Sequence, residues 1–203
     1  MRMKILFFGD SITEGNRDPL DPTSLGDGYV YILHEKLKNL YEDIRFEFVN
    51  CGISHSRIAD LEPLAEKEMR EQQPDIAVVL IGINDVWSRG GMDVVFEEER
   101  FSAAYERTLA EIKTGRAKLI VVEPFLFNVP DKKRFRKNFD SMLTAIKAAA
   151  EKYADAFVAL DEMFAGVSQS VGISAYSLDG VHPTHRAARL IADNIIKKIK
   201  LFL

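Results

Sequence analysis

The sequence is poor in cysteine and has no excess of basic residues. Cys51 is its only cysteine, so the chain can form no internal disulfide, which suits a reducing compartment. The 27 Lys and Arg residues are outnumbered by 31 Asp and Glu residues, which gives a formal net charge of −4. Because a nucleic-acid-binding surface needs clustered positive charge, this balance argues against nucleic acid as a partner.

The sequence also lacks a long hydrophobic run. The apolar stretch near the amino end, Ile5–Gly9, is too short for the core of a signal peptide, and no small-residue cleavage site follows it. No stretch approaches the roughly 20 apolar residues that a transmembrane helix needs. We therefore expect a cytoplasmic protein without a membrane partner.

Apolar residues nevertheless make up 47% of the chain, and they alternate between strand-like and helix-like patterns. The expected strands are Lys4–Gly9, Arg45–Asn50, Ile76–Ile81, Leu119–Glu123 and Phe157–Leu160. The expected helices are Tyr29–Leu40, Ile58–Arg70, Glu97–Lys113, Phe135–Tyr153 and Thr184–Phe202. This alternation predicts an α/β protein with a parallel sheet. No repeat or linker interrupts it, so we expect one domain over residues 1–203.

A serine stands directly after the first expected strand, in Gly9-Asp10-Ser11. The carboxyl ends of parallel strands form the edge at which α/β proteins bind their ligands. A hydroxyl at this edge is well placed to attack a substrate, although it needs a base to remove its proton. The position of Ser11 therefore predicts a nucleophile, and a long loop, Asn16–Gly28, follows it.

Among the four histidines, His182 is the best candidate for that base. Asp179 precedes it by three residues and Gly180 permits a tight turn between them, so the carboxylate can orient the imidazole as in a Ser-His-Asp triad. A plain helix-capping turn is the alternative explanation of this segment. His34 lies in a helical pattern and suggests a structural role, and His55 is interpreted as an ordinary loop histidine.

Two further segments offer groups that could stabilise an oxyanion. Gly52 follows the second expected strand, where a bare backbone N–H can approach a ligand closely, and Asn84 follows the third. Each also has a simpler explanation, because Gly52 could serve only as a turn residue and Asn84 only as a former of Asx turns.

Taken together, these segments resemble the four blocks of the SGNH hydrolase superfamily, also called the GDSL esterases and lipases. The blocks are F-G-D-S-I-T at 8–13, Gly52, G-I-N-D at 82–85 and D-G-V-H-P-T at 179–184. The resemblance implies a flavodoxin-like three-layer α/β/α sandwich whose five-stranded parallel sheet has the order 2-1-3-4-5. It also implies Ser11 as nucleophile, His182 as base and Asp179 as its acid, with neither cofactor nor metal. The implied oxyanion donors are the Ser11 and Gly52 N–H groups and the Asn84 side chain.

A finer resemblance is to the branch of small intracellular esterases that includes xylan-oligosaccharide acetylesterases, carried by I-G-I-N-D-V-W at 81–87 and E-P-F at 123–125. It implies an acetylated sugar as substrate. Trp87 would then stack on the sugar or close a small acyl pocket. Asp10 is a second candidate for substrate binding, with holding the turn at Ser11 as its simpler role. Leu178 departs from the branch, which tends to carry an aromatic residue there.

Other functions compete with this one. Lysophospholipases and acyl-thioesterases use the same triad on the same fold, and a non-catalytic carbohydrate-binding relative would use the fold alone. A metal-dependent hydrolase could use Asp179, His182 and His185, which are spaced as D-x-x-H-x-x-H. The apolar loop Phe125–Val129 is a candidate subunit contact, which would make the protein a homo-oligomer.

Overall fold

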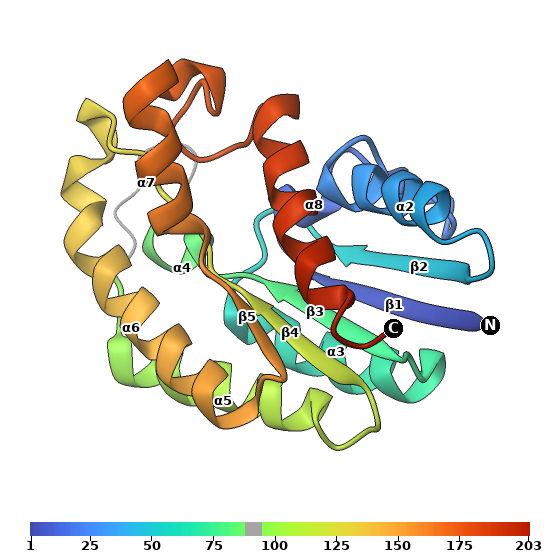
Figure 1. Cartoon of the computed structure of the whole chain (residues 1–203). Coiled ribbons are helices and arrows are strands. Elements are labelled where there is room, and N and C mark those ends of the chain that lie inside the picture. Colours follow the sequence, from blue (N-terminus) through green and yellow to red (C-terminus); the bar gives the residue numbers. More distant parts are fainter. Residues whose placement is uncertain (88–94) are drawn as a thin grey trace.

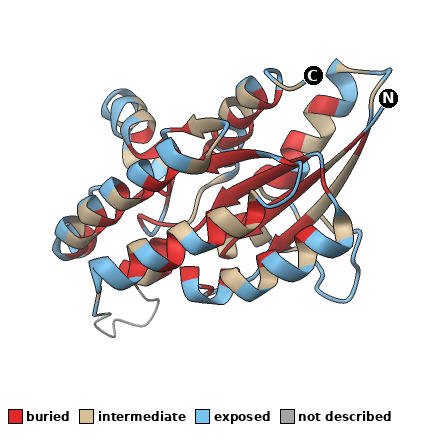
Figure 2. Cartoon of the chain, turned by 90° about the horizontal axis from the view of Figure 1, so that it is seen from below, coloured by how far each residue is buried: buried red, intermediate tan, exposed pale blue. Residues whose placement is uncertain are grey.

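The computed structural model describes residues 1–87 and 95–203, and a five-stranded parallel sheet forms their centre. The strand order β2-β1-β3-β4-β5 confirms the expected topology (Figure 1). The strands are β1 (Arg2–Gly9), β2 (Arg45–Gly52), β3 (Ile76–Leu80), β4 (Lys118–Val122) and β5 (Ala156–Val158). Every residue of β3 is buried and apolar, as expected of a central strand that helices cover on both faces (Figure 2).

Helices form the two outer layers of the sandwich. On one face α2 (Tyr29–Leu40) packs against α8 (His185–Ile199), and on the other α5 (Glu98–Ile112) packs against α3 (Ile58–Gln72) and α6 (Arg136–Tyr153). The apolar stripe of α8 faces inward, so one continuous core extends from Met3 to Ile199. Within the described ranges no helix is long and apolar enough to cross a membrane.

The carboxyl edge of the sheet carries several short elements. Helix α1 (Ser11–Glu14) follows β1, and α4 (Ile83–Val86) follows β3. Two 3-10 helices, η1 (Pro130–Phe135) and η2 (Ile173–Ala175), lie in the loops that precede α6 and α8. Ser11 and Asn84 therefore lie in short helices that follow strands, whereas Asp179 and His182 lie in the loop between η2 and α8.

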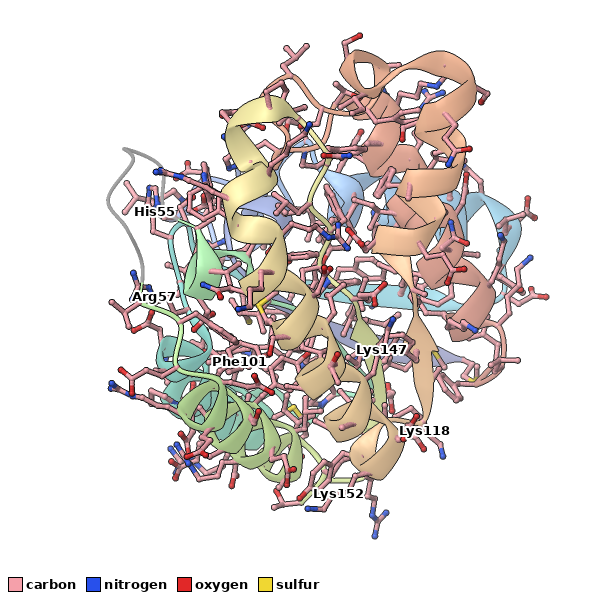
Figure 3. The ribbon with its side chains drawn as sticks, turned by 90° about the vertical axis from the view of Figure 1, so that its left-hand side faces the viewer. His55, Arg57, Phe101, Lys118, Lys147 and Lys152 are labelled. Atoms are coloured by element: carbon pink, nitrogen blue, oxygen red, sulfur yellow. The ribbon has the colours of Figure 1, made fainter. Side chains whose placement is uncertain are left out.

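A buried carboxylate stands directly after β4. Glu123 is fully buried, and its Oε2 accepts the backbone N–H of Asp161 at 3.1 Å. The only cation at its other oxygen, among the described residues, is Lys147 of α6, whose Nζ lies 3.0 Å from Oε1 (Figure 3). This ion pair joins the α6 layer to the end of β4 and compensates a charge that burial would otherwise penalise.

The structure corrects three expectations. A helix that the sequence did not reveal, α7 (Leu160–Val171), follows a β5 strand that ends at Val158 rather than at Leu160. Its Gly and Ser residues hide the helical pattern, and packing of Phe164 in the core compensates for their low helix propensity. The last helix begins at His185, with Thr184 as its N-cap.

The third correction concerns the apolar loop at 125–129. Phe125, Leu126 and Phe127 are buried within the chain itself. Both phenylalanine rings pack against Phe164 of α7, at centroid distances of 4.6 and 5.2 Å. These side chains are part of the core and therefore do not offer the surface that a subunit contact would need.

Candidate active site

Ser11 is placed by the junction between β1 and α1. The strand ends at Gly9, Asp10 caps the helix through its Oδ1, which accepts the N–H of Ile12 at 3.0 Å, and Ser11 is the first helical residue. The side chain of Ser11 is half-buried, and its Oγ lies 3.1 Å from Nε2 of His182. Two groups separated by 171 positions in the sequence are thus within hydrogen-bond distance.

The second half of the constellation is the pair formed by Asp179 and His182. Asp179 Oδ2 accepts a hydrogen bond from Nδ1 of the imidazole at 2.6 Å. Asp179 Oδ1 accepts the backbone N–H groups of Val181 and His182 at 2.9 and 2.8 Å. The carboxylate therefore organises the turn and orients the ring at the same time, so the turn does more than cap a helix.

The loop that carries this pair is fixed at both ends. After His182, Thr184 bonds back to the segment before the loop: its Oγ1 donates to the carbonyl oxygen of Ala175 at 2.7 Å, and its N–H donates to the carbonyl oxygen of Tyr176 at 2.8 Å. At the turn, Gly180 donates its N–H to Oγ of Ser177 at 3.0 Å. Because these bonds hold the chain on either side of His182, the imidazole enters the site with little freedom to rotate away.

The electrostatics of the pair set the tautomer of the imidazole. Burial alone would raise the pKa of Asp179, but the hydrogen bonds from His182 and from the two backbone N–H groups outweigh it and hold the pKa at about 2. Asp179 is therefore ionised at neutral pH and can only accept hydrogen bonds. Nδ1 of His182 must carry the proton, which leaves Nε2 free to accept the hydroxyl proton of Ser11.

Asn84 occupies the corresponding position after β3. Gly9 and Leu80 are register partners in the sheet, so α1 and α4 start at neighbouring points of its carboxyl edge. The Asn84 side chain is buried, and its Nδ2 donates to the carbonyl oxygen of Ser56 at 3.0 Å. This bond fixes the amide and uses one of its two N–H groups, and the second bonds to no residue that the structure describes, so it can donate to a ligand.

Gly52 has a different environment from the one that the sequence suggested. Its N–H already donates to Oδ1 of Asn50 at 2.9 Å. A Cβ at this position would lie 2.3 Å from the backbone nitrogen of Glu14, so glycine is required for α1 to pack against the end of β2. The role of Gly52 as an oxyanion donor stays a prediction, and its structural role is evident.

The turn after Gly52 brings a second backbone group to this edge. His55 is exposed and has a left-handed backbone (φ 67°), which is uncommon outside glycine. Its N–H makes no hydrogen bond to any part of the chain that the structure describes. Figure 3 shows His55 and Arg57 at the end of the molecule opposite Lys118, the first residue of β4.

One buried and one half-buried carboxyl group neighbour Ser11 and Asn84 in the sequence. Asp10 is almost fully buried, and burial together with the charge of Asp85 raises its pKa to about 7. Burial also raises the pKa of Asp85 to about 7, although its Oδ2 accepts the N–H of Ile58 at 3.1 Å. Asp85 received no role from the sequence, in which its place beside Asn84 is its only signal.

Trp87 packs against the imidazole. Its ring centroid lies 6.1 Å from that of His182 in an edge-to-face arrangement, and Lys132 Nζ sits 5.3 Å from the indole ring centroid. With only 7% of its surface exposed, Trp87 supports the imidazole rather than forming an open platform for a ligand.

A cavity of about 440 Å³ opens beside Ser11. It lies between α1 with its following loop and the amino end of α8, and its polar lining residues are Ser11, Asn16, Asp27, His182 and His185. A larger cavity, about 730 Å³, lies between the carboxyl ends of α3 and α5 at the opposite edge of the sheet, away from Ser11 and His182. The chemistry identifies the smaller cavity as the candidate active site.

Comparison with known families agrees with this geometry. The model of the GDSL-like lipase/acylhydrolase family matches residues 7–190. The chain belongs to this family. It is 30% identical to an acetylxylan esterase of Geobacillus stearothermophilus, over 97% of this chain and 93% of that protein. As a member of the GDSL-like family, it is a carboxylic ester hydrolase.

Solved structures show the same architecture. The crystal structure of Axe2, an acetylxylan esterase of Geobacillus stearothermophilus, superposes on this GDSL-like enzyme with a TM-score of 0.87 and 28% identity. The superposition covers 97% of this chain and 94% of Axe2. LAE5, a hydrolase from the metagenome of Lake Arreo in Spain, shares the fold at a TM-score of 0.85 and 23% identity, over 96% and 94% of the two chains.

Proposed function

We propose that this GDSL-like enzyme is a serine esterase that removes small acyl groups, acetyl above all, from the hydroxyls of carbohydrates. Its triad is Ser11, His182 and Asp179. The observation that carries the proposal is the unbroken path from Asp179 Oδ2 to His182 Nδ1 at 2.6 Å and from His182 Nε2 to Ser11 Oγ at 3.1 Å. Both distances suit proton transfer. Catalytic mutants of Axe2, in which a serine, an aspartate or a histidine is replaced by alanine, support the same assignment.

The geometry supports acyl transfer in two halves. Ser11 Oγ forms a bond to the ester carbonyl carbon while Nε2 of His182 takes its proton, and the carbonyl π electrons move to the oxygen. When this intermediate collapses, the bond to the alcohol oxygen breaks, and that oxygen leaves with the proton from Nε2. Water then attacks the acyl-serine, gives its proton to His182, and releases the acid as Ser11 Oγ regains a proton. Asp179 stabilises the imidazolium in both halves.

The negative charge on the carbonyl oxygen needs donors at the same edge. The proposed donors are the Ser11 N–H, the Nδ2 of Asn84 and the Gly52 N–H, and each is worth about 3 kcal/mol of barrier. The Gly52 N–H would have to share its hydrogen with Asn50 Oδ1. The N–H of His55, in the next turn, is therefore the competing candidate for the third position.

Trp87 and Asp10 receive different roles in this proposal. Trp87, packed against the back of the imidazole and under Lys132, limits the space available to the acyl group, which favours acetyl over long chains. Asp10 is nearly inaccessible and bonded to Ile12, so it acts by holding the turn that presents Ser11 rather than by touching substrate. The acetylxylan esterase relative supports an acetylated sugar as substrate.

A series of p-nitrophenyl esters from acetate to decanoate tests the proposal, with Ser11→Ala and, as a matched control, Ser141→Ala on α6. We expect a maximum of kcat/KM at acetate, a fall in kcat of at least about 10⁴-fold in Ser11→Ala and no fall in Ser141→Ala. A maximum beyond butyrate would favour a lysophospholipase or acyl-thioesterase. Chelator-sensitive activity that survives Ser11→Ala would favour the metal-dependent alternative with Asp179, His182 and His185.

A further inference from the structure

The surroundings of Ser11 indicate where the alcohol part and the acyl part of the ester lie. In the proposed reaction the leaving oxygen takes its proton from Nε2 of His182, so this oxygen must lie within hydrogen-bond distance of that atom. His182 and Ser11 both line the 440 Å³ cavity, whereas Trp87 does not. The group attached to the leaving oxygen therefore extends into this cavity, and the acyl group lies on the side of Trp87 and Asn84.

The cavity suits a polar group much larger than acetyl. Its volume of about 440 Å³ falls in the range of small-molecule sites and can accommodate at least one sugar ring. Three of its polar lining residues, Asn16, Asp27 and His185, have no part in the triad. Among the lining residues, Ile12 is the only apolar side chain on the wall opposite α8, which is otherwise formed by Gly, Ser, Asn and Asp, so a long alkyl chain would find few apolar partners there.

The wall that carries Asp27 is rigid. The N–H of Asp27 donates to the carbonyl oxygen of Gly15 at 2.7 Å and closes the loop on itself. Gly26, with φ 73°, has no room for a side chain, since a Cβ would lie 1.9 Å from that same carbonyl oxygen. Asn50 Nδ2 donates to the carbonyl oxygens of Thr13 and Leu25 at 2.9 and 3.3 Å, which fixes both arms of the loop to the end of β2. The carboxylate is thus preorganised beside the nucleophile.

Asp27 retains hydrogen-bonding capacity after these contacts. Asn16 Nδ2 lies 3.0 and 3.3 Å from the two carboxylate oxygens, and among residues 1–87 and 95–203 no Lys or Arg forms an ion pair with them. A carboxylate has about four acceptor sites, so its two oxygens can still accept two O–H groups. Two neighbouring hydroxyls on a sugar ring can donate one hydrogen bond to each of the two carboxylate oxygens. A phosphate headgroup would be repelled by the same charge.

We infer that the cavity between α1 and α8 holds the sugar of the substrate and that Asp27, positioned by Asn16, accepts hydrogen bonds from its free hydroxyls. Asp27 is then the residue that makes the esterase select a carbohydrate alcohol. This inference rests on the proposed function, because it takes Ser11 and His182 as the nucleophile and the proton donor.

The test compares two acetate esters that differ in two hydroxyl groups. One is methyl β-xylopyranoside with a single O-acetyl group and two free hydroxyls, and the other carries hydrogen in place of those two hydroxyls. We expect the wild type to prefer the free-hydroxyl ester by about tenfold or more in kcat/KM, since each hydrogen bond to a charged acceptor is worth about a factor of ten. In Asp27→Asn and Asp27→Ala the preference should fall to threefold or less. Asp21→Asn, a matched control in the same loop, should keep it.

Every other outcome contradicts either the role of Asp27 or the proposed esterase function. If both Asp27 variants keep the wild-type preference, or if the wild type shows none, the assignment of Asp27 is wrong while the esterase stands. The same holds if the wild type cleaves p-nitrophenyl acetate but neither sugar ester. If Ser11→Ala cleaves both sugar esters as fast as the wild type, the proposed function itself fails. Circular dichroism of each variant checks that the fold is retained.

Discussion

Replacing Asp179 with asparagine should abolish catalysis while leaving the loop in place. The amide oxygen of asparagine can still accept the backbone N–H groups of Val181 and His182, which Asp179 Oδ1 now accepts at 2.9 and 2.8 Å. Its NH₂ group would then face Nδ1 of His182, where Asp179 Oδ2 now accepts at 2.6 Å. Because an NH₂ group cannot accept the Nδ1 proton, the imidazole must place its proton on Nε2, toward Ser11.

The expected fall in kcat follows from the change of imidazole tautomer. An Nε2–H donates to Ser11 Oγ instead of removing its proton, and no carboxylate remains to stabilise the imidazolium. Aspartate-to-asparagine replacement in a triad of this kind lowers kcat by about 10⁴-fold, which corresponds to about 5 kcal/mol of barrier. KM should change little, since Asp179 does not line the cavity.

The assay is kcat and KM on p-nitrophenyl acetate for the wild type, Asp179→Asn and Asp131→Asn. Asp131 is a matched control because it lies within electrostatic range of Asp179 but pairs with Lys132 rather than with His182. We expect Asp131→Asn to retain most of its activity. A folded Asp179→Asn variant with more than a tenth of the wild-type kcat would refute the role of Asp179 as the orienting acid.

Three further substitutions test the framework around the site. The raised pKa of Asp10, about 7 against an ordinary 3.8, means that the folded state binds its proton more tightly than the unfolded state, so stability is lost as pH rises from about 4 to 7. Between pH 4 and pH 8 the free energy of unfolding of Asp10→Asn, measured in urea, should gain a few kcal/mol on the wild type, and a constant difference would contradict this. Gly52→Ala should lower the free energy of unfolding by about 2 kcal/mol or more through its clash with α1, whereas Gly166→Ala, whose Cβ meets open space, should raise it slightly in the same denaturation assay. Lys147→Ala should lower the free energy of unfolding by about 3 kcal/mol, because it leaves the buried carboxylate of Glu123 without its ion-pair partner. Lys152→Ala, which removes an exposed ion pair on the same helix, should lower it by less than about 1 kcal/mol. Equal losses would show that burial is irrelevant to the Lys147–Glu123 pair.

Much of the fold was predictable because its signals are local. The five strands are short apolar runs, and all but one of the long helices carry an inward apolar stripe that the sequence displays. Helix α7 escaped prediction because its strongest determinant is not local. Phe164 is held by Phe125 and Phe127, which come from another loop, and these contacts compensate for the Gly and Ser residues around it.

The site was predictable only in part, for the same reason. Residue type and position after a strand indicated Ser11 and Asn84, and the spacing of Asp179 and His182 before the last helix indicated that pair. Position alone could not show that Asn50 engages the Gly52 N–H, because that depends on a side-chain rotamer. The lining role of Asp27 likewise depends on how the loop after Ser11 folds back on Gly15.

The sequence by itself determined which chemical groups reach the carboxyl edge of the sheet, because a parallel α/β topology sends the residue after each strand to the same place. Only the tertiary structure decided how these groups meet. The 3.1 Å between Ser11 and His182 is set by the packing of α8 against α2 and by the bonds that hold Thr184 and Gly180. Burial, which gives Asp10 and Asp85 their raised pKa values, is likewise a property of the packed chain, since it depends on neighbours that lie far away in the sequence.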